Sequence, residues 1–135
     1  MKVFRWLAAI LLAAVLALGI VLAINYFNDT IEYKSGEGNA VKPPTNTLTV
    51  LNWNIGYAGL GKDSDFVMDG GQMLQPPSKT HVEANLAGIR RILADNPANV
   101  NFFQEISEPD LLTRGVDVLA GIRGQLTGRS WFFSN

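Results

Sequence analysis

The chain has 135 residues, no cysteine, and a nearly balanced charge of 11 basic against 12 acidic side chains. Once an apolar N-terminal segment is set aside, this length accommodates at most one small domain, near the lower range for burying a good core. The balanced charge offers no broad basic surface, which argues against holding nucleic acid through charge alone. Without cysteine there is neither a disulfide nor a thiolate metal site, and this is compatible with either redox compartment.

The N-terminal segment is a continuous apolar run. Every residue from Trp6 to Ile24 is uncharged, and most are Leu, Ala, Ile or Val. At about 1.5 Å per residue, a helix over this run is about 28 Å long, close to the roughly 30 Å hydrocarbon core of a bilayer. Lys2 and Arg5 precede the run and acidic residues follow it, so the positive-inside rule predicts a cytoplasmic N-terminus and an extracytoplasmic C-terminal domain.

We therefore expect residues 1–5 to be cytoplasmic and residues 6–27 (Trp6–Phe27) to form a single-pass signal anchor in the cell membrane. A cleaved signal peptide is the main alternative, although no clean small-x-small cleavage step follows the apolar run. A buried core helix is the other alternative, and it is disfavoured because no polar stripe interrupts the run.

Residues 28–47 are polar and contain several glycines and prolines, which predicts a linker. Within this stretch, residues 30–34 alternate weakly and could pair as an edge strand. The following domain is expected over residues 48–135.

The first convincing strand of that domain is Leu48 to Ile55. Its apolar residues fall on both faces, which predicts an interior strand. Asn54 interrupts the pattern near the C-terminal end, and a buried amide needs hydrogen-bond partners. Asn54 either belongs to a functional site or merely ties down the next turn.

The long loop over residues 56–77 contains a near match to a phosphate-binding loop. Gly56 to Asp63 follows a strand, but Asp63 replaces the Ser or Thr that would hold magnesium. The acids of the loop also lack the spacing of a calcium-binding loop. Neither a nucleotide site nor a calcium site is predicted there, and the acids are interpreted as solvated.

A helix is predicted after the loop, with a capping box formed by Thr80 and Glu83 and an end at Pro97. The apolar residues at helical spacing are Val82, Leu86, Ile89 and Leu93. His81, the single histidine, lies in the first turn and is interpreted as a surface residue rather than a ligand or base.

A second strand is predicted over Val100 to Ile106. Strand, helix and strand together predict a parallel pair, which places Asn54 and Glu105 at the same edge of the sheet. Active sites of open sheets gather at that edge. Two explanations of Glu105 remain open: a salt bridge to a nearby Arg, or a ligand for a hard cation such as Mg²⁺.

The rest of the chain predicts a second helix over residues 110–126, capped by Ser107 to Pro109, although three glycines weaken it. The aromatic run from Trp131 is interpreted as the start of a third strand.

The two strand motifs resemble the start of the endonuclease/exonuclease/phosphatase superfamily, which has a DNase-I-like fold. The motifs are Leu51-Asn-Trp-Asn54-Ile and Asn101-Phe-Phe-Gln-Glu105-Ile. The apolar anchor, with Asn54 to Asp63 and Phe66 to Gly71, resembles the membrane-anchored bacterial branch of that superfamily. The resemblance implies an α/β fold for residues 48–135, the N-terminal part of a four-layer α/β sandwich.

The resemblance also implies roles for individual residues. The residue matching Asn54 lies at the metal and the scissile phosphate, and the one matching Glu105 binds a divalent cation, usually Mg²⁺, with Mn²⁺ as the alternative. Asn54 and Glu105 are therefore the expected catalytic and metal-binding residues, and Gln104 is expected to support the site.

The later motifs of the superfamily, an Asp/Asn pair and an Asp-His that activates water, are not found in the 135 residues, and His81 matches neither. We therefore expect an incomplete domain, the N-terminal portion of a longer enzyme, which is inactive by itself. The identity of the general base stays open.

The sequence thus predicts part of a membrane-anchored, divalent-metal-dependent phosphoester hydrolase. Its substrate could be nucleic acid, a lipid headgroup or a small phosphate ester, and no protein partner is predicted. The alternative is a non-catalytic, membrane-tethered interaction module or a truncated gene remnant.

Overall fold

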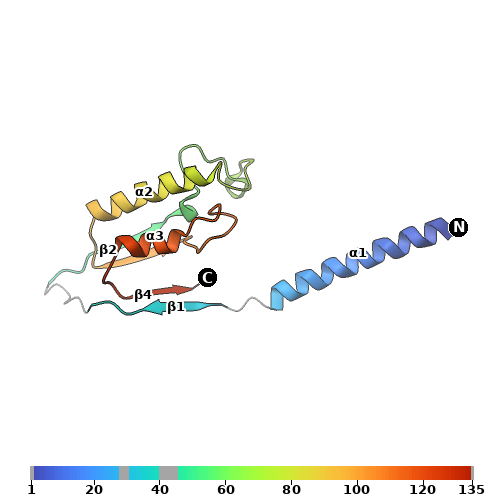
Figure 1. Cartoon of the computed structure of the whole chain (residues 1–135), viewed down its shortest axis with the longest axis horizontal. Coiled ribbons are helices and arrows are strands. Elements are labelled where there is room, and N and C mark those ends of the chain that lie inside the picture. The colour runs from blue at the N-terminus through green and yellow to red at the C-terminus, as the bar shows by residue number, and fades with distance from the viewer. Residues whose placement is uncertain (1, 28–30, 40–45, 135) are drawn as a thin grey trace. The chain divides into compact units, whose positions relative to one another are not determined.

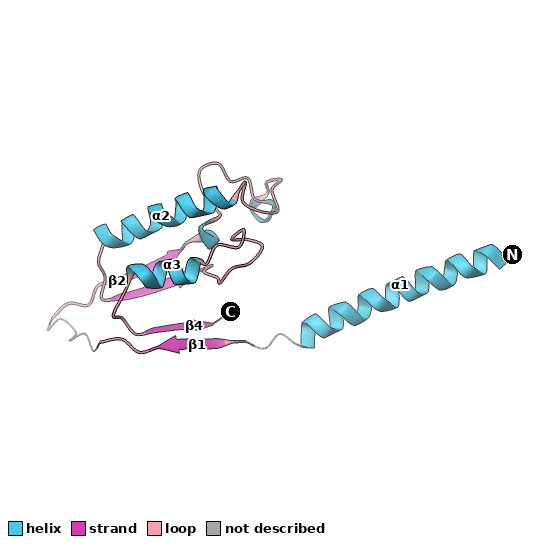
Figure 2. Ribbon diagram, viewed as in Figure 1, coloured by secondary structure: helices cyan, strands magenta, loops and turns pink. Residues whose placement is uncertain are grey.

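The computed structural model describes residues 2–27, 31–39 and 46–134, and they form a mixed α/β structure (Figures 1 and 2). The helices are α1 (Lys2–Phe27), α2 (Lys79–Asp95) and α3 (Val118–Gln125), with short 3₁₀ turns at Gly56–Ala58 and Val67–Asp69. The strands are β1 (Tyr33–Gly36), β2 (Val50–Asn54), β3 (Val100–Gln104) and β4 (Trp131–Ser134).

Helix α1 is the apolar segment of the sequence. Its stretch Phe4–Ile24, 21 residues, is long and apolar enough to cross a membrane, and none of that stretch is buried inside the protein. The structure therefore gives no support to a core helix. The orientation of the anchor and the absence of cleavage stay predictions.

Strands β2 and β3 form a two-stranded parallel sheet, as predicted from the strand, helix, strand order. Helices α2 and α3 lie on the same side of it (Figure 2). The core consists of apolar residues of the two helices and of the segment after β2, packed against the inward side chains of the sheet, Leu51, Trp53 and Phe103.

The opposite face of this sheet is exposed, so the prediction of an interior strand is wrong for this structure. Val50 is 54% exposed and Phe102 is 55% exposed. On the same face, Gln104 Nε2 donates a 2.6 Å hydrogen bond to Asn52 Oδ1. The error arose because the period-two pattern shows which residues share a face, while another layer has to be present for that face to be covered.

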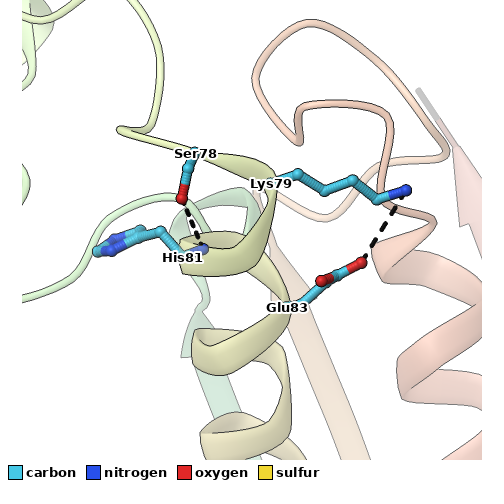
Figure 3. Close-up of polar contacts among 4 residues, drawn as sticks. All are labelled: Ser78, Lys79, His81 and Glu83. Carbon is cyan, nitrogen blue, oxygen red and sulfur yellow. Dashed lines mark hydrogen bonds and ion pairs between the residues drawn. The ribbon is translucent and has the colours of Figure 1, made fainter.

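Helix α2 carries the predicted buried stripe, but its cap differs from the prediction. Ser78 is the N-cap residue, and its Oγ accepts a 3.1 Å hydrogen bond from the His81 backbone N–H (Figure 3). The capping box on Thr80 and Glu83 is therefore wrong. Glu83 instead forms a 3.9 Å ion pair with Lys79.

Helix α3 is much shorter than the predicted helix over residues 110–126. Arg114 and Gly115 have positive φ angles of 52° and 77°, which a right-handed helix cannot contain. The helix starts only after Asp117, whose side chain accepts a 2.8 Å bond from the Ala120 N–H. Local side-chain bonding by Asp and Thr residues competes with helix formation in this segment.

Strand β4 confirms the predicted third strand, and β1 (Tyr33–Gly36) overlaps the predicted edge strand over residues 30–34 at Tyr33 and Lys34 only, while residue 30 lies outside the described residues. The two strands pair with each other rather than with the β2–β3 sheet. At Gly36, an added Cβ would overlap the Trp131 indole, and the Arg123 guanidinium lies 3.9 Å from the centroid of that ring.

The long loop after β2 is folded back on itself. Phe66 is buried and forms a parallel bridge with Met73, and the Asp65 backbone oxygen accepts bonds from Gln72 and Met73. Turns and bends, rather than an α-helix, follow Lys62, which differs from the strand, loop and helix of a phosphate-binding loop.

Candidate functional site

The candidate site lies where β2 and β3 end. The parallel register pairs Asn54 with Gln104. Glu105, the residue after Gln104, therefore lies at the same edge of the sheet as Asn54. The backbone bonding continues past the strands. The Ile55 N–H donates to the Gln104 backbone carbonyl oxygen at 3.0 Å, and the Tyr57 N–H donates to the Glu105 backbone carbonyl oxygen at 2.7 Å. The structure thus brings the two predicted residues together at one edge.

The backbone at this edge has an unusual conformation. Gly56, Tyr57 and Ala58 have φ angles of 55°, 54° and 53°, and Glu105, which faces them, has a φ of 52°. Left-handed backbone costs a non-glycine residue about 1–2 kcal/mol. Such strain persists where the surrounding structure over-determines it, and it clusters at functional sites.

Three polar contacts and one buried residue hold this turn. Asn54 Oδ1 accepts a 2.9 Å bond from the Gly56 N–H, and Asn85 Nδ2 of α2 donates a 3.0 Å bond to the Ala58 oxygen. Ala58 is fully buried, and the Tyr57 N–H bond to Glu105 completes the set. The left-handed turn is thereby fixed to both β3 and α2.

Asn54 therefore does tie down the next turn, which was one of its two interpretations. This role uses one lone pair of Oδ1. No other hydrogen bond to its side chain is found within the described part of the chain, and the side chain is exposed. An amide carries a second lone pair on oxygen and two donors on nitrogen, so Asn54 can also serve a ligand.

The Glu105 carboxylate is partly buried. Among residues 2–27, 31–39 and 46–134, none forms an ion pair or a hydrogen bond with this carboxylate. The predicted salt bridge to an Arg is thus not formed within those ranges. The second explanation, a ligand for a hard cation, stays a prediction.

Tyr57 and Asp110 were missed as site residues by the sequence analysis. The pKa of the Tyr57 phenol is raised above its ordinary value, first by burial and then by the negative charges of Glu105 and Asp110. Asp110 is held in place by its own turn, because its Oδ1 accepts a 2.7 Å bond from the Thr113 N–H. No sequence motif marked either residue, since only the tertiary fold brings them to this edge.

Amide and carboxylate oxygens, the kinds that Asn54 and Glu105 carry, are among the ligand types of hard cations such as Mg²⁺. Mg²⁺ is usually held by one or two carboxylates, with waters and substrate phosphate completing the shell. Over the described residues, no group of three or more His, Cys, Asp or Glu side chains is placed to hold a metal.

Gln104 is the register partner of Asn54, and its side chain is exposed on the open sheet face, where it bonds Asn52. Its supporting role stays a prediction. His81 is partly buried rather than on the surface as interpreted, and its Nε2 is enclosed with no hydrogen-bond partner in the described ranges.

Comparison of the chain with family models, curated proteins and solved structures finds no match to any of them. The resemblance to the endonuclease/exonuclease/phosphatase superfamily therefore stays a prediction from the two strand motifs.

Proposed function

We propose that this chain carries the metal-binding and phosphate-binding edge of a membrane-anchored, divalent-metal-dependent phosphoester hydrolase of the endonuclease/exonuclease/phosphatase type. The observation that carries the proposal is the parallel register, which pairs Asn54 with Gln104 and so puts the Asn54 amide and the Glu105 carboxylate at one edge. The strained turn that joins Tyr57 to Glu105 supports it, because strain of this kind clusters at functional sites.

In this proposal, Glu105 and Asn54 hold Mg²⁺ or Mn²⁺, and Asn54 also orients the phosphate. The bound cation would supply Lewis-acid polarisation of the phosphoryl oxygens. The chain's own contribution is to fix the Glu105 backbone, whose carbonyl oxygen accepts the Tyr57 N–H bond, and to present the Asn54 amide from a side chain whose Oδ1 already anchors the turn. No residue of this chain is assigned the role of general base.

The finer architecture also belongs to this proposal. Parallel sheets are normally covered on both faces, whereas the face carrying Val50 and Phe102 is exposed here. This supports β2 and β3 as one layer of a DNase-I-like four-layer sandwich. Helix α1 anchors the protein in the cell membrane, and Lys2 and Arg5 support a cytoplasmic N-terminus with the domain on the other side.

Mn²⁺ binding to the full 135-residue chain in detergent micelles tests the metal assignment. Titration followed by the electron paramagnetic resonance signal of free Mn²⁺ gives the affinity for wild type, Glu105→Gln and Asn54→Ala. We expect Asn54→Ala to weaken binding about 10–100-fold, the usual size of a change close to a metal, and Glu105→Gln to weaken it at least as much. Glu83→Gln, the same chemical change on α2, is the matched control and should bind like wild type. Equal affinity of Glu105→Gln and wild type would refute the assignment.

A second function, a membrane-tethered interaction module, is favoured by the exposed apolar sheet face. Val50 and Phe102 are each more than half exposed, and a membrane anchor would concentrate copies in one plane. In this case the face would bind a second copy of the chain. Sedimentation in micelles would then show a dimer that Val50→Ser with Phe102→Ser makes monomeric. A monomeric wild type would exclude self-association as the function.

A further inference from the structure

Arg114 joins the two loops that follow β2 and β3. It lies in the loop after β3, and its Nε donates a 2.8 Å hydrogen bond to the backbone oxygen of Pro76, near the end of the long loop after β2. The two residues are 38 positions apart in the sequence, so this bond connects separate segments. Both loops begin at the carboxyl ends of the parallel strands, where ligands bind in open α/β sheets.

Pro76 also packs against the start of its own loop. Its side chain is fully buried. A Cβ added at Gly59 would lie 2.5 Å from Pro76 Cγ and 3.2 Å from the Leu112 backbone oxygen. Gly59 directly follows the left-handed turn at Gly56–Ala58. The segment that carries Arg114 is therefore packed against the turn at the end of β2.

The backbone of Arg114 is fixed by the turn that contains it. Thr113 is fully buried, and its Oγ1 accepts a 3.0 Å bond from the Asp110 N–H. The Gly115 N–H donates to the Asp110 backbone oxygen at 2.9 Å. Arg114 itself has a φ of 52°, a left-handed conformation that disfavours a side chain. The arginine is thus held at its backbone by this turn and at its Nε by Pro76.

The outer end of the guanidinium group has no partner in the described part of the chain. A guanidinium carries five N–H donors, and only the one on Nε is used. No ion pair of Arg114 is found over residues 2–27, 31–39 and 46–134, and the residue is exposed. It is also the single basic residue among residues 105–117. The donors on Nη1 and Nη2 are therefore available to an anion from solution.

The geometry of these donors defines the anion. Two parallel N–H groups on a planar cation match two oxygens of one phosphate or carboxylate group. Binding normally has to immobilise a flexible arginine side chain, which weakens the interaction. The bond from Nε to Pro76 already restricts this side chain, so less freedom is lost when the anion binds.

We propose that Arg114 binds a phosphate group of the substrate through Nη1 and Nη2. It is then a substrate-binding residue in addition to Asn54 and Glu105, and it acts without a metal. The choice of phosphate as the anion rests on the proposed function, whereas the free donors and their fixed position do not.

The test follows the reaction of individual arginines in the full chain. Phenylglyoxal modifies exposed guanidinium groups, and a bound phosphate shields them. The metal-free protein in maltoside micelles is treated in glycerol phosphate or in sodium chloride of equal ionic strength, and mass spectrometry of peptides gives the rate at each arginine. Arg90 on α2 is the matched control in the same sample, since it is exposed and forms no ion pair within the described ranges.

We expect glycerol phosphate to slow the modification of Arg114 by about threefold when its concentration is about twice the dissociation constant. The rate at Arg90 should be the same in both salts. Equal rates at Arg114 in the two salts would overturn the inference, because a purely structural arginine gains no protection. Equal slowing of Arg114 and Arg90 would also overturn it, because the effect would then be general.

A second measurement uses variants. Glycerol phosphate should raise the Tm of wild type, since it binds the folded chain. The rise should be lost in Arg114→Gln and kept in Arg90→Gln. An equal rise in Arg114→Gln and wild type would contradict the inference.

A further arm of the protection assay distinguishes two sources of phosphate. Mixed micelles of maltoside and phosphatidylglycerol replace the free glycerol phosphate. Selective protection of Arg114 by free glycerol phosphate supports a soluble phosphoester, and selective protection by phosphatidylglycerol alone supports a lipid headgroup. Protection by neither overturns the inference.

The proposed function fails in a different experiment. If Glu105→Gln binds Mn²⁺ as tightly as wild type, the metal assignment is refuted, while selective protection of Arg114 in the metal-free chain still supports the phosphate site. Loss of that protection, with Mn²⁺ binding that depends on Glu105, overturns the inference and leaves the metal assignment standing.

Discussion

The N-terminus of α2 offers a sharp test, because the sequence and the structure assign its cap to different residues. Ser78 Oγ accepts a 3.1 Å bond from the His81 N–H, so Ser78→Ala leaves one helix N–H without a side-chain partner. Loss of an N-cap costs about 1 kcal/mol, within a range of roughly 0.5–2 kcal/mol. Thr80 lies inside the first turn, where alanine is the better helix former by up to about 0.7 kcal/mol.

The two substitutions are therefore expected to have opposite signs. In a domain of this size, about 1 kcal/mol corresponds to a change in Tm of roughly 4–8 °C. Ser78→Ala should lower the Tm by about that amount, and Thr80→Ala should leave it unchanged or raise it slightly. Thermal unfolding of the full chain in micelles, followed by near-ultraviolet circular dichroism, measures both.

Glu83→Gln separates the cap from the neighbouring ion pair. The Lys79 and Glu83 side chains are 62% and 54% exposed and 3.9 Å apart, so the pair contributes only about 0–0.5 kcal/mol. Glu83→Gln should therefore destabilise the protein less than Ser78→Ala does. If Thr80→Ala proves as destabilising as Ser78→Ala, then Ser78 is not the cap and the predicted capping box on Thr80 and Glu83 is correct.

Two further predictions concern Tyr57 and Gly36. The folded-state pKa of Tyr57 is raised above 10.0, so its contribution to stability is present below the unfolded-state pKa near 10 and is lost as the pH rises through the folded-state value. The free energy of unfolding should therefore fall less steeply above pH 10 in Tyr57→Phe than in wild type. Identical slopes in the two proteins would contradict the raised pKa. Gly36→Ala places a Cβ against the Trp131 indole and should destabilise the protein by about 1–3 kcal/mol, whereas Gly88→Ala on α2, with nothing near the added Cβ, should stabilise it by up to about 1 kcal/mol. Denaturant titrations of both variants compare these effects, and stabilisation by both would mean that β1 and β4 do not pack as described.

The sequence by itself determined the elements whose signals are local. The apolar run of α1, the buried stripe of α2 and the alternation of β2 and β3 all follow from the spacing of side chains along the chain. The parallel pairing followed as well, because a helix between two strands makes a parallel crossover the expected connection. Asn54 and Glu105 were brought to one edge by this reasoning alone.

The tertiary structure decided what depends on contacts between distant residues. The structure places the cap of α2 at Ser78 and not at Thr80. Several residues near a helix start can accept a hydrogen bond from the free N–H groups, and only the actual backbone path selects one of them. Residues 110–117 form turns because side-chain bonds such as Asp110 to Thr113 replace helical ones. The exposure of one face of β2 could not be predicted, because alternation along a strand carries no information about which layer covers each face.

The site shows the same division. Sequence spacing could place a carboxylate and an amide at the ends of two strands, since parallel strands end at the same edge. The left-handed turn, the bond from the Tyr57 N–H to Glu105, and the approach of Asp110 required the folded chain. These contacts join residues that are far apart in sequence, and no local pattern encodes a backbone that is strained by its tertiary neighbours.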